Sequence, residues 1–217
     1  MSQNKRNFQK ELDRILEWEE DRGKTLLLHS CCAPCSSYVL EYLSNFFEIT
    51  VLYYNPNIYP EQEYEKRVNE QEKLIEQMHT RYPVHMIRGR FDPREFYDAV
   101  RGLEQIPEGG ERCHACFRLR LAESARIAAE GSFDYFTTTL TISPLKNAGK
   151  LNEIGEELSH LYGVPWLPSD FKKKNGYKRS VELSARYGLY RQDYCGCVFS
   201  KQERTAASEA KFSEVKA

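Results

Sequence analysis

Apolar positions along the chain fall into two kinds of segment. Short apolar runs rich in β-branched and aromatic residues occupy residues 25–30, 49–54, 84–87 and 134–143, and a weaker run occupies 164–167. Between them, apolar residues recur every three or four positions, which is the spacing of an amphipathic helix. This alternation predicts an α/β protein, with an open parallel sheet covered by helices on both faces in three layers.

The predicted helices alternate with these strands. They cover residues 4–22, the region around 38–43, 60–82, a segment starting at Asp92-Pro93, 113–130 and 147–161. We therefore expect an N-terminal amphipathic helix in residues 1–23 and a single α/β domain in residues 24–207. The polar composition of residues 208–217 favours disorder.

The composition is that of an ordinary globular protein. The 217 residues include 41% hydrophobic and 29% charged residues, with a net charge of -1, so the overall balance does not indicate a nucleic-acid binder. A local basic surface is still compatible with this balance. No apolar run approaches the roughly 20 residues needed to span a bilayer, and the polar N-terminus lacks the core of a signal peptide. We expect a cytoplasmic location and no membrane partner.

Seven cysteines gather in three clusters. Cys31, Cys32 and Cys35 directly follow the first predicted strand, and the others form the pairs Cys113/Cys116 and Cys195/Cys197. In a reducing cytosol, this clustering fits metal binding or redox chemistry better than disulfides or independent packing. Because loops at the carboxyl ends of parallel strands meet at one sheet edge, we expect the cysteine-rich and polar loops to form one site.

The number of thiols exceeds the need of one metal centre. Thiolates favour soft or borderline metals such as zinc, or iron–sulfur clusters. A structural zinc ion takes four ligands, and so does one [4Fe–4S] cluster. Three of the seven thiols are then left over, which indicates a second metal or a redox pair beside the first centre.

Three other chemistries are disfavoured by the motifs. The loop Ser30-Cys-Cys-Ala-Pro-Cys35 replaces the Ser-Gly-Gly-x-Asp-Ser pattern of ATP-using PP-loop enzymes, and it has no glycine to let the backbone cradle a phosphate. The CxxxCxxC motif of radical-SAM enzymes is missing. A thioredoxin-type CxxC is available at Cys113 to Cys116, but it leaves five cysteines unexplained.

Six motifs, taken in order, resemble the QueH-type epoxyqueuosine reductase family over about residues 24 to 200. They are Cys31-Cys-Ala-Pro-Cys35, Tyr54-Asn-Pro-Asn-Ile58, Cys113-x-x-Cys116, Ser143-Pro-x-Lys-Asn147, Asp170-Phe-Lys and Tyr190-Arg-Gln-Asp-Tyr-Cys-Gly-Cys197. The resemblance implies a HUP-like α/β domain, related in architecture to PP-loop proteins without their ATP chemistry. It also implies conversion of epoxyqueuosine at the wobble position of tRNA to queuosine. The implied cofactors are a [4Fe–4S] cluster and an adjacent mononuclear iron, without cobalamin. The electrons come from an unidentified donor.

On this resemblance, roles are assigned to particular residues. All seven cysteines are predicted metal ligands: Cys113 and Cys116 with two of the first triplet for the cluster, and Cys195, Cys197 and the remaining thiol for the second iron. Asp170 is the predicted catalytic residue, as an oxygen ligand or a proton donor. The predicted substrate-binding residues are Tyr54, Asn55, Asn57, Ser143, Lys146, Asn147, Lys172 and Arg191.

Two further questions stay open at this point. The basic stretch Lys172–Arg179 is either a phosphate-contacting surface or the solvated start of a helix, and the resemblance favours tRNA contact by Lys172 to Lys174. His29 is expected to be held by the backbone rather than to bind metal. The second class of function is a zinc-binding module whose thiols are structural and which binds nucleic acid without catalysis.

Overall fold

β1 (Thr25–His29) is one of two inner strands of a parallel sheet in the computed structural model, which describes residues 6–18 and 22–214. The strand order is β3-β2-β1-β4. The other strands are β2 (Glu48–Tyr53), β3 (Val84–Arg88) and β4 (Tyr135–Thr138). Leu26 pairs with Ile49 on one side and with Tyr135 on the other, so the apolar centre of β1 is enclosed by strands on both sides.

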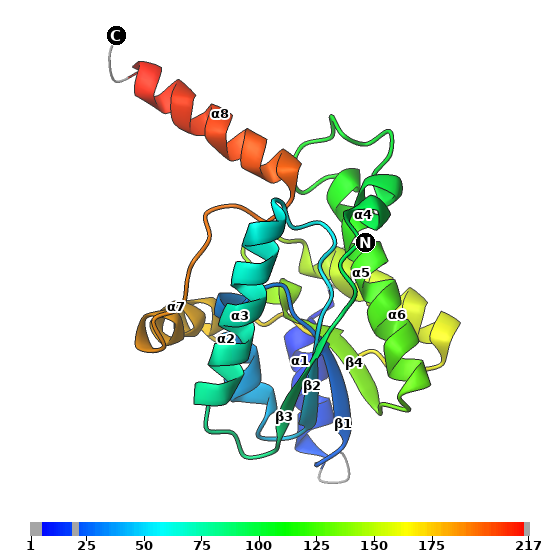
Figure 1. Ribbon diagram of the computed structural model, residues 1–217. Helices are drawn as coiled ribbons and strands as arrows, with labels where there is room; N and C mark the ends of the chain where they lie inside the picture. Colours follow the sequence, from blue (N-terminus) through cyan, green and yellow to red (C-terminus); the bar gives the residue numbers. More distant parts are fainter. Residues whose placement is uncertain (1–5, 19–21, 215–217) are drawn as a thin grey trace, which may run out of the picture.

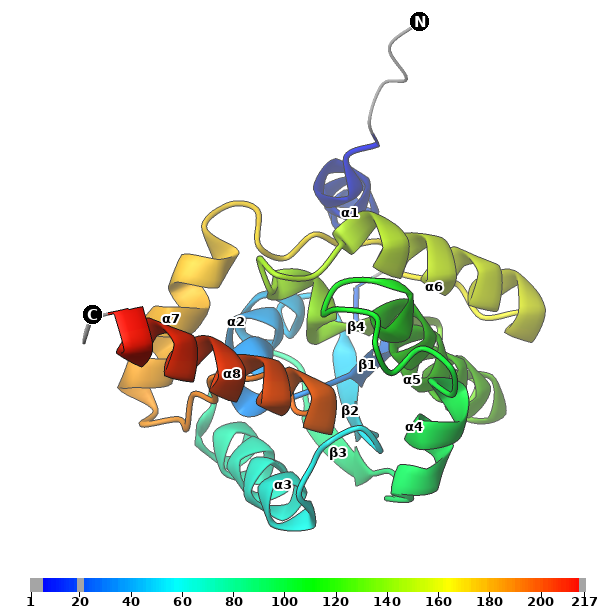
Figure 2. The same cartoon turned by 90° about the horizontal axis from the view of Figure 1, so that it is seen from above.

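Helices cover both faces of this sheet. They are α1 (Phe8–Glu17), α2 (Ala33–Leu43) and α3 (Glu61–Gln77) on one face, and α5 (Glu111–Glu130) and α6 (Ala148–Tyr162) on the other. Successive strand side chains point to opposite faces, so Leu26 and Leu28 are buried against the first set of helices and Leu27 against the second. Figure 2 shows the sheet between α2 and α3 on one side and α5 on the other. The predicted open parallel sheet with helices on both faces, in three layers, is confirmed.

The remaining helices extend from this framework. They are the short α4 (Pro93–Ala99), α7 (Gly176–Arg186) and α8 (Val198–Glu214). α7 packs closely on α2, because Gly176 has no side chain and lies against the ring of Tyr38. α8 projects away from the body of the protein (Figure 1). Within the described ranges, no helix is both long enough and apolar enough to cross a bilayer.

The carboxyl ends of the strands carry the chemistry-bearing loops. The chain leaves β1 into the cysteine triplet, leaves β2 into residues 54–60, and leaves β4 into the 3₁₀ helix η2 (Thr139–Ile142). The Ser30 amide donates to the Leu52 carbonyl, and the Asn55 side chain donates to the Ser30 carbonyl. These bonds hold the first two loops together at one edge of the sheet.

Two of the predicted strands differ from the structure. β4 ends at Thr138, where the threonine hydroxyl accepts a hydrogen bond from the Leu140 amide and turns the chain into η2, so the prediction of a strand through residue 143 is wrong. The predicted strand at 164–167 is reduced to a single bridge between Phe136 and Trp166. Pro165 has no N–H to donate, which prevents a regular ladder there.

Three other predicted segments differ from the structure or extend beyond the part that it describes. α1 covers residues 8–17 of the predicted helix, whereas residues 4–5 and 19–21 lie outside the described residues. α3 ends at Gln77 rather than at Tyr82. Residues 208–214 belong to α8 and residues 215–217 lie outside the described part, so the disorder expected for 208–217 stays a prediction.

Gly155 provides a test of how tightly α6 packs on the sheet. A Cβ atom at this position would lie 2.3 Å from the Trp166 ring. The ring cannot easily retreat, because its Nε1 donates to Asn152 Oδ1 and its face meets Phe136. Gly155→Ala should therefore lower the free energy of unfolding by about 1–3 kcal/mol from overpacking, despite the better helix propensity of alanine.

Urea unfolding is the measurement for this prediction. Leu161→Ala, at an exposed position of the same helix, is the control and should change stability by no more than about 0.5 kcal/mol. An unchanged or raised stability of Gly155→Ala would show that the Trp166 ring does not constrain α6.

Candidate metal and substrate site

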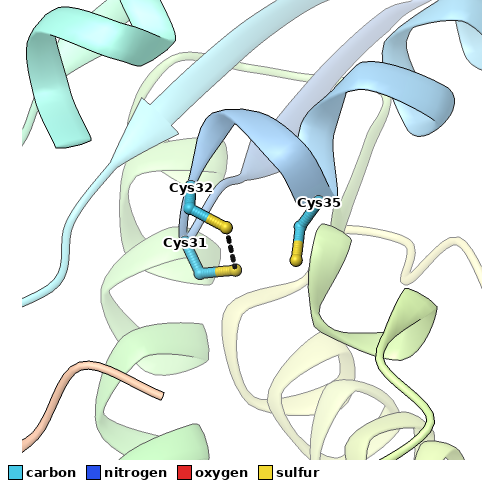
Figure 3. Close-up of side chains that lie close together, drawn as sticks. All are labelled: Cys31, Cys32 and Cys35. Atoms are coloured by element: carbon cyan, nitrogen blue, oxygen red, sulfur yellow. Dashed lines mark hydrogen bonds between the residues drawn. The ribbon is translucent and has the colours of Figure 1, made fainter. Parts of the chain in front are cut away.

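The cysteine triplet sits at the amino end of α2. Cys32 is the N-cap residue and Pro34 occupies the first turn, a position where its missing N–H costs no hydrogen bond. The three sulfur atoms all lie within 4.8 Å of one another, with 3.8 Å between Cys31 and Cys32. Figure 3 shows the three side chains turned toward one another. This group could bind a metal ion, since its sulfurs converge on one point.

Mutual contact separates the proton affinities of these thiols. Hydrogen bonds from Cys31 and Cys35 hold the pKa of the Cys32 thiol well below its ordinary value, and the charge of Arg67 acts in the same direction. The contacts with Cys31 and Cys32 raise the pKa of the Cys35 thiol. Among the three thiols, the thiolate form is therefore favoured most at Cys32, and the positive end of the α2 dipole acts in the same direction.

The other four cysteines line one small cavity. Cys113 and Cys116 lie in the first turns of α5, and Cys195 and Cys197 lie in the segment that enters α8. Burial raises the pKa of the Cys116 thiol to about 12, and burial also raises the pKa of Cys113 and of Cys197. These four thiols surround a cavity, whereas no second group in the described ranges converges as closely as the triplet does. A cavity bordered by thiols suits a larger inorganic group than a single ion.

Gly196 allows the close spacing of Cys195 and Cys197. Its φ angle is 129°, a conformation that residues with a side chain rarely adopt. A Cβ atom there would also come within 3.1 Å of Arg67 Nη1. Because Arg67 Nη1 donates to the Cys195 carbonyl, the absence of a side chain lets the arginine hold this turn.

A larger cavity joins the two sets of thiols. Its volume is about 400 Å³, and it is lined by Cys31 and Cys35 from the triplet and by Cys195 from the other set. Lys146 also lines it. Burial favours the neutral amine, but the thiol groups of Cys195, Cys31 and Cys35 outweigh burial and hold the pKa of Lys146 above its ordinary value. Lys146 therefore adds a positively charged side chain to the cavity that thiols of both sets line.

Three buried arginines stand around the thiols. They are Arg67, Arg112 and Arg120, each no more than 3% exposed, and each has one guanidinium nitrogen without a hydrogen-bond partner. Glu63 pairs with Arg67 and Glu203 pairs with Arg112. Arg120 has no carboxylate partner in the described part of the chain, since it donates only to the Cys116 carbonyl and the Asn55 amide oxygen. It lines both cavities.

A network of hydrogen bonds supports the cysteine triplet. The hydroxyls of Ser30 and Ser36 both lie within 2.8 Å of Gln71 Oε1, and the Tyr53 hydroxyl donates to the Cys31 carbonyl. His29 Nε2 donates to the Tyr54 carbonyl, which leaves Nδ1 to accept from the Thr138 hydroxyl. Burial, followed by the charge of Arg120, lowers the pKa of His29 to about 3. The ring is therefore neutral and fully bonded, as expected from the sequence.

Four of the predicted substrate-binding residues reach the cavities. Ser143, Lys146 and Arg191 line the large cavity. Asn57 lines the small one, and its buried Oδ1 has no hydrogen-bond partner. Asn147 lies near the thiols of Cys113 and Cys195, but its side chain also caps α6 by accepting from the Lys150 amide.

The other predicted site residues have internal partners. The Tyr54 hydroxyl donates to Glu95, and both polar atoms of the Asn55 side chain are used, by the Ser30 carbonyl and by Arg120. Asp170 pairs with Lys172 at 2.5 Å, and neither lines one of the two cavities. The structure thus does not bring Asp170 and Lys172 together with the thiols.

The basic stretch is largely neutralised by neighbouring acids. Besides the pair formed by Lys172, Lys174 pairs with Asp13 and Arg179 pairs with Glu41. Asn175 and Gly176 begin α7, so the stretch is also the entrance of a helix. Its contact with tRNA stays a prediction.

Sequence reasoning missed the three buried arginines. Arg120 lies one helical turn after Cys116 and Arg112 directly precedes Cys113, so their places on α5 were available as a signal once that segment was assigned as a helix. No such signal marked Arg67. It lies in a highly charged helix, and the sequence does not distinguish this buried arginine from the other charged residues around it. Tyr194 and Glu108, which also line the large cavity, were missed as well.

The fold and the two thiol sets define a thiol-rich α/β protein in which one group of cysteines could bind a metal, with a cavity beside the thiols. The family model described as Epoxyqueuosine reductase QueH matches residues 26–203. The chain belongs to this family, as its six motifs predict.

Relatives from several bacteria agree with this assignment. A protein of Streptococcus pyogenes serotype M1 named epoxyqueuosine reductase QueH is 44% identical over 196 residues, covering 87% of this chain and 77% of the relative. The protein of that name from Staphylococcus epidermidis is 43% identical, covering 94% of this chain and 88% of the relative. The one from Thermotoga maritima is 35% identical, covering 83% of this chain and 92% of the relative.

The geometry predicts two separable metal-binding sets. We expect the metal-free protein to bind about two Co²⁺ ions per chain, each with thiolate charge-transfer absorption, since each set has enough thiols for a largely sulfur-bound ion. Cys32→Ser should remove one of the two and Cys116→Ser the other. Absorption titrations under anaerobic conditions measure both.

Ser37→Ala is the matched control for these variants. It lies in the same helix as the triplet and bonds only to the Pro34 carbonyl, so it should keep both ions. If either single cysteine substitution abolished all Co²⁺ binding, the seven thiols would form one set rather than two.

Proposed function

We propose that this chain reduces epoxyqueuosine in tRNA to queuosine at the wobble position. Membership of the QueH family is the observation that carries the proposal, because the named relatives are epoxyqueuosine reductases. The reaction removes the epoxide oxygen as water and leaves an alkene, so it requires two electrons and two protons. The alternative, a zinc module without catalysis, is not favoured by relatives that are named as reductases.

We further propose a [4Fe–4S] cluster and an adjacent mononuclear iron, held by different thiols than the sequence alone suggested. Cys113, Cys116, Cys195 and Cys197 border one cavity and match the four ligands of a cluster. Cys31, Cys32 and Cys35 converge on a point and suit a single ion. When bound, the cluster supplies electron transfer and the iron supplies a Lewis acid. This division replaces the earlier expectation that the triplet is shared between the two centres.

The buried arginines support an anionic group at the thiols. A cation without a counter-charge in the interior costs several kcal/mol, and Arg120 has only neutral hydrogen-bond partners. A metal group ligated by four thiolates carries negative charge and provides the missing compensation. Arg120 would then hold this charge next to both cavities, with its free Nη2 as a hydrogen-bond donor.

The large cavity is the proposed binding site of the modified base. Its volume of about 400 Å³ falls in the range of small-ligand pockets. The Lys146 ammonium would donate a hydrogen bond to the epoxide oxygen, and the Ser143 hydroxyl and Arg191 would bind the polar groups of the base. Asn57, with its unpartnered Oδ1, would bind from the side of the small cavity.

We also propose roles for the other predicted site residues, a location and an electron donor. Asp170 as a metal ligand or proton donor requires the Asp170–Lys172 pair to open, since neither residue lines the cavities. Tyr54, Asn55 and Asn147 act by positioning their neighbours. A cytoplasmic location fits the modification of tRNA, and the electron donor is an unidentified partner.

Anaerobic turnover is the direct test of this function. The reconstituted protein should convert epoxyqueuosine in tRNA to queuosine in the presence of a chemical reductant, followed by nucleoside mass spectrometry. Iron and acid-labile sulfide should approach about five and about four per chain for one cluster and one iron. A zinc-only protein without labile sulfide after reconstitution would refute the proposed cofactors.

Arg120 gives a test of the proposed charge balance. Arg120→Gln should lower the reduction potential of the cluster by about 60 mV or more, a tenfold change for one electron, because a nearby positive charge favours the reduced, more negative state. Arg120→Lys should lie close to the wild type. Spectroscopic redox titration measures the potential without any assay of turnover.

Arg118→Gln is the control on the same helix. Arg118 is exposed and pairs with Glu157 away from the thiols, so its loss should leave the potential unchanged. An intact cluster with the wild-type potential in Arg120→Gln would rule out the proposed role of Arg120.

A further inference from the structure

Aromatic and basic side chains alternate along one side of the large cavity. We call this band the rim, and it consists of Tyr59, Tyr177, Arg191, Tyr194, Lys201 and Arg204. Four of these residues line the cavity, and Lys201 and Tyr59 continue the band beyond Tyr194. The rim therefore lies where a large substrate must pass when one of its groups enters the cavity.

The rim is built from four separate parts of the chain that are held in contact. The Tyr194 hydroxyl donates to the Tyr59 carbonyl at 2.7 Å, and the Tyr59 amide donates to the Gly196 carbonyl. The Lys201 ammonium lies 5.7 Å from the centre of the Tyr59 ring and 5.8 Å from that of Tyr194. These contacts join the loop after β2 to the cysteine segment and to α8, so Tyr59, Tyr194 and Lys201 lie together on the rim.

The cations of the rim are available to a partner. Arg191, Lys201 and Arg204 are exposed, and in the described ranges none of the three forms an ion pair with a carboxylate. This distinguishes the rim from the stretch 172–179, where three of the five basic side chains are paired with acids. The charged residues that line the large cavity comprise four cations and two carboxylates, so its lining carries a net positive charge even before the rim is extended to Lys201.

The rings of Tyr59 and Tyr177 are also accessible to a partner. Tyr59 is 46% exposed and Tyr177 is 40% exposed, which is high for large aromatic side chains. Beyond Tyr59 lies another cavity of about 170 Å³, lined by Asn57, Phe96 and Tyr97 among others. Exposed rings beside a pocket provide stacking surfaces for unpaired bases.

We propose that the rim binds the single-stranded loop of an RNA. In this arrangement Arg191, Lys201 and Arg204 contact the phosphates, and Tyr59 and Tyr177 stack on bases that flank the nucleotide in the large cavity. The proposal deepens the function proposed above and rests on it for the choice of RNA. A double-stranded RNA would offer the phosphates but not the unpaired bases, so it would use only half of the rim.

The phosphate contacts are tested by charge removal in the full-length protein. The triple variant Arg191→Gln, Lys201→Gln and Arg204→Gln should bind a fluorescent anticodon stem-loop RNA at least tenfold more weakly. The slope of the logarithm of affinity against the logarithm of salt concentration should fall in magnitude by about 2, since each lost contact with single-stranded RNA removes about 0.7. Fluorescence anisotropy across a salt series gives both values.

The control triple variant is Arg22→Gln, Lys73→Gln and Arg81→Gln. It removes the same charge from exposed positions near the opposite edge of the sheet, where Arg22 precedes β1 and Arg81 precedes β3. It should keep the affinity and the salt slope of the wild type. Equal losses in the two triple variants would mean that net charge, rather than the rim, determines binding.

The stacking contacts are tested with Tyr59→Leu and Tyr177→Leu. Each should weaken the stem-loop about tenfold without changing the salt slope, and should leave the binding of a fully paired duplex of the same length unaltered. Equal effects on loop and duplex would overturn the stacking role.

These binding measurements use unmodified RNA and need no turnover. If the rim binds RNA but the protein fails to reduce epoxyqueuosine, only the proposed reaction is refuted. If the enzyme is active but the rim substitutions leave its affinity for RNA unchanged, only the proposed role of the rim is refuted.

Discussion

The hydrogen bonds of His29 tie together the three strands from which the site is built. His29 is the last residue of β1, and its neutral ring joins the end of β2 through the Tyr54 carbonyl to the end of β4 through the Thr138 hydroxyl. The side chain is fully buried, so both nitrogens must be bonded for the fold to be stable. The loops that carry Cys31, Asn55 and Ser143 therefore leave the sheet from neighbouring, fixed points.

Charge balance is the second constraint on this edge of the sheet. The interior contains the cations of Arg67, Arg112 and Arg120, and Lys146 lines the cavity beside them. Two of these arginines have carboxylate partners, but Arg112 and Arg120 line the cavity of the four thiols and the charge of Arg67 acts on Cys32. A protein that buries cations beside thiols stabilises anionic sulfur ligands in advance of any metal, so the chemistry of the site is built into the packing of α3 and α5.

The sequence was sufficient for the layer structure and for the cysteine sets, but not for how those sets are grouped. The period of the apolar residues predicted β1 to β3 and the long helices, because burial on one face or two is a local pattern. Thr139 to Ile142 looked like strand because β-branched residues also pack well in a buried turn, and only the hydrogen bond to the Thr138 hydroxyl decides between the two. The grouping of Cys195 with Cys113 depends on where α8 docks against α5. That docking is fixed by the contact of Arg112 with Glu203, which lies 91 residues away along the chain.

The split position of the four-thiol set has a consequence for biosynthesis. Two of its cysteines lie at the start of α5, and the other two lie beside Gly196, near the end of the chain. On the ribosome, the sheet and the triplet can be complete while Cys195 and Cys197 have not yet been made. A cofactor that needs all four thiols can therefore enter only after the segment with Cys195 and Cys197 has been made, so its delivery must follow translation of this segment rather than guide the folding of the sheet.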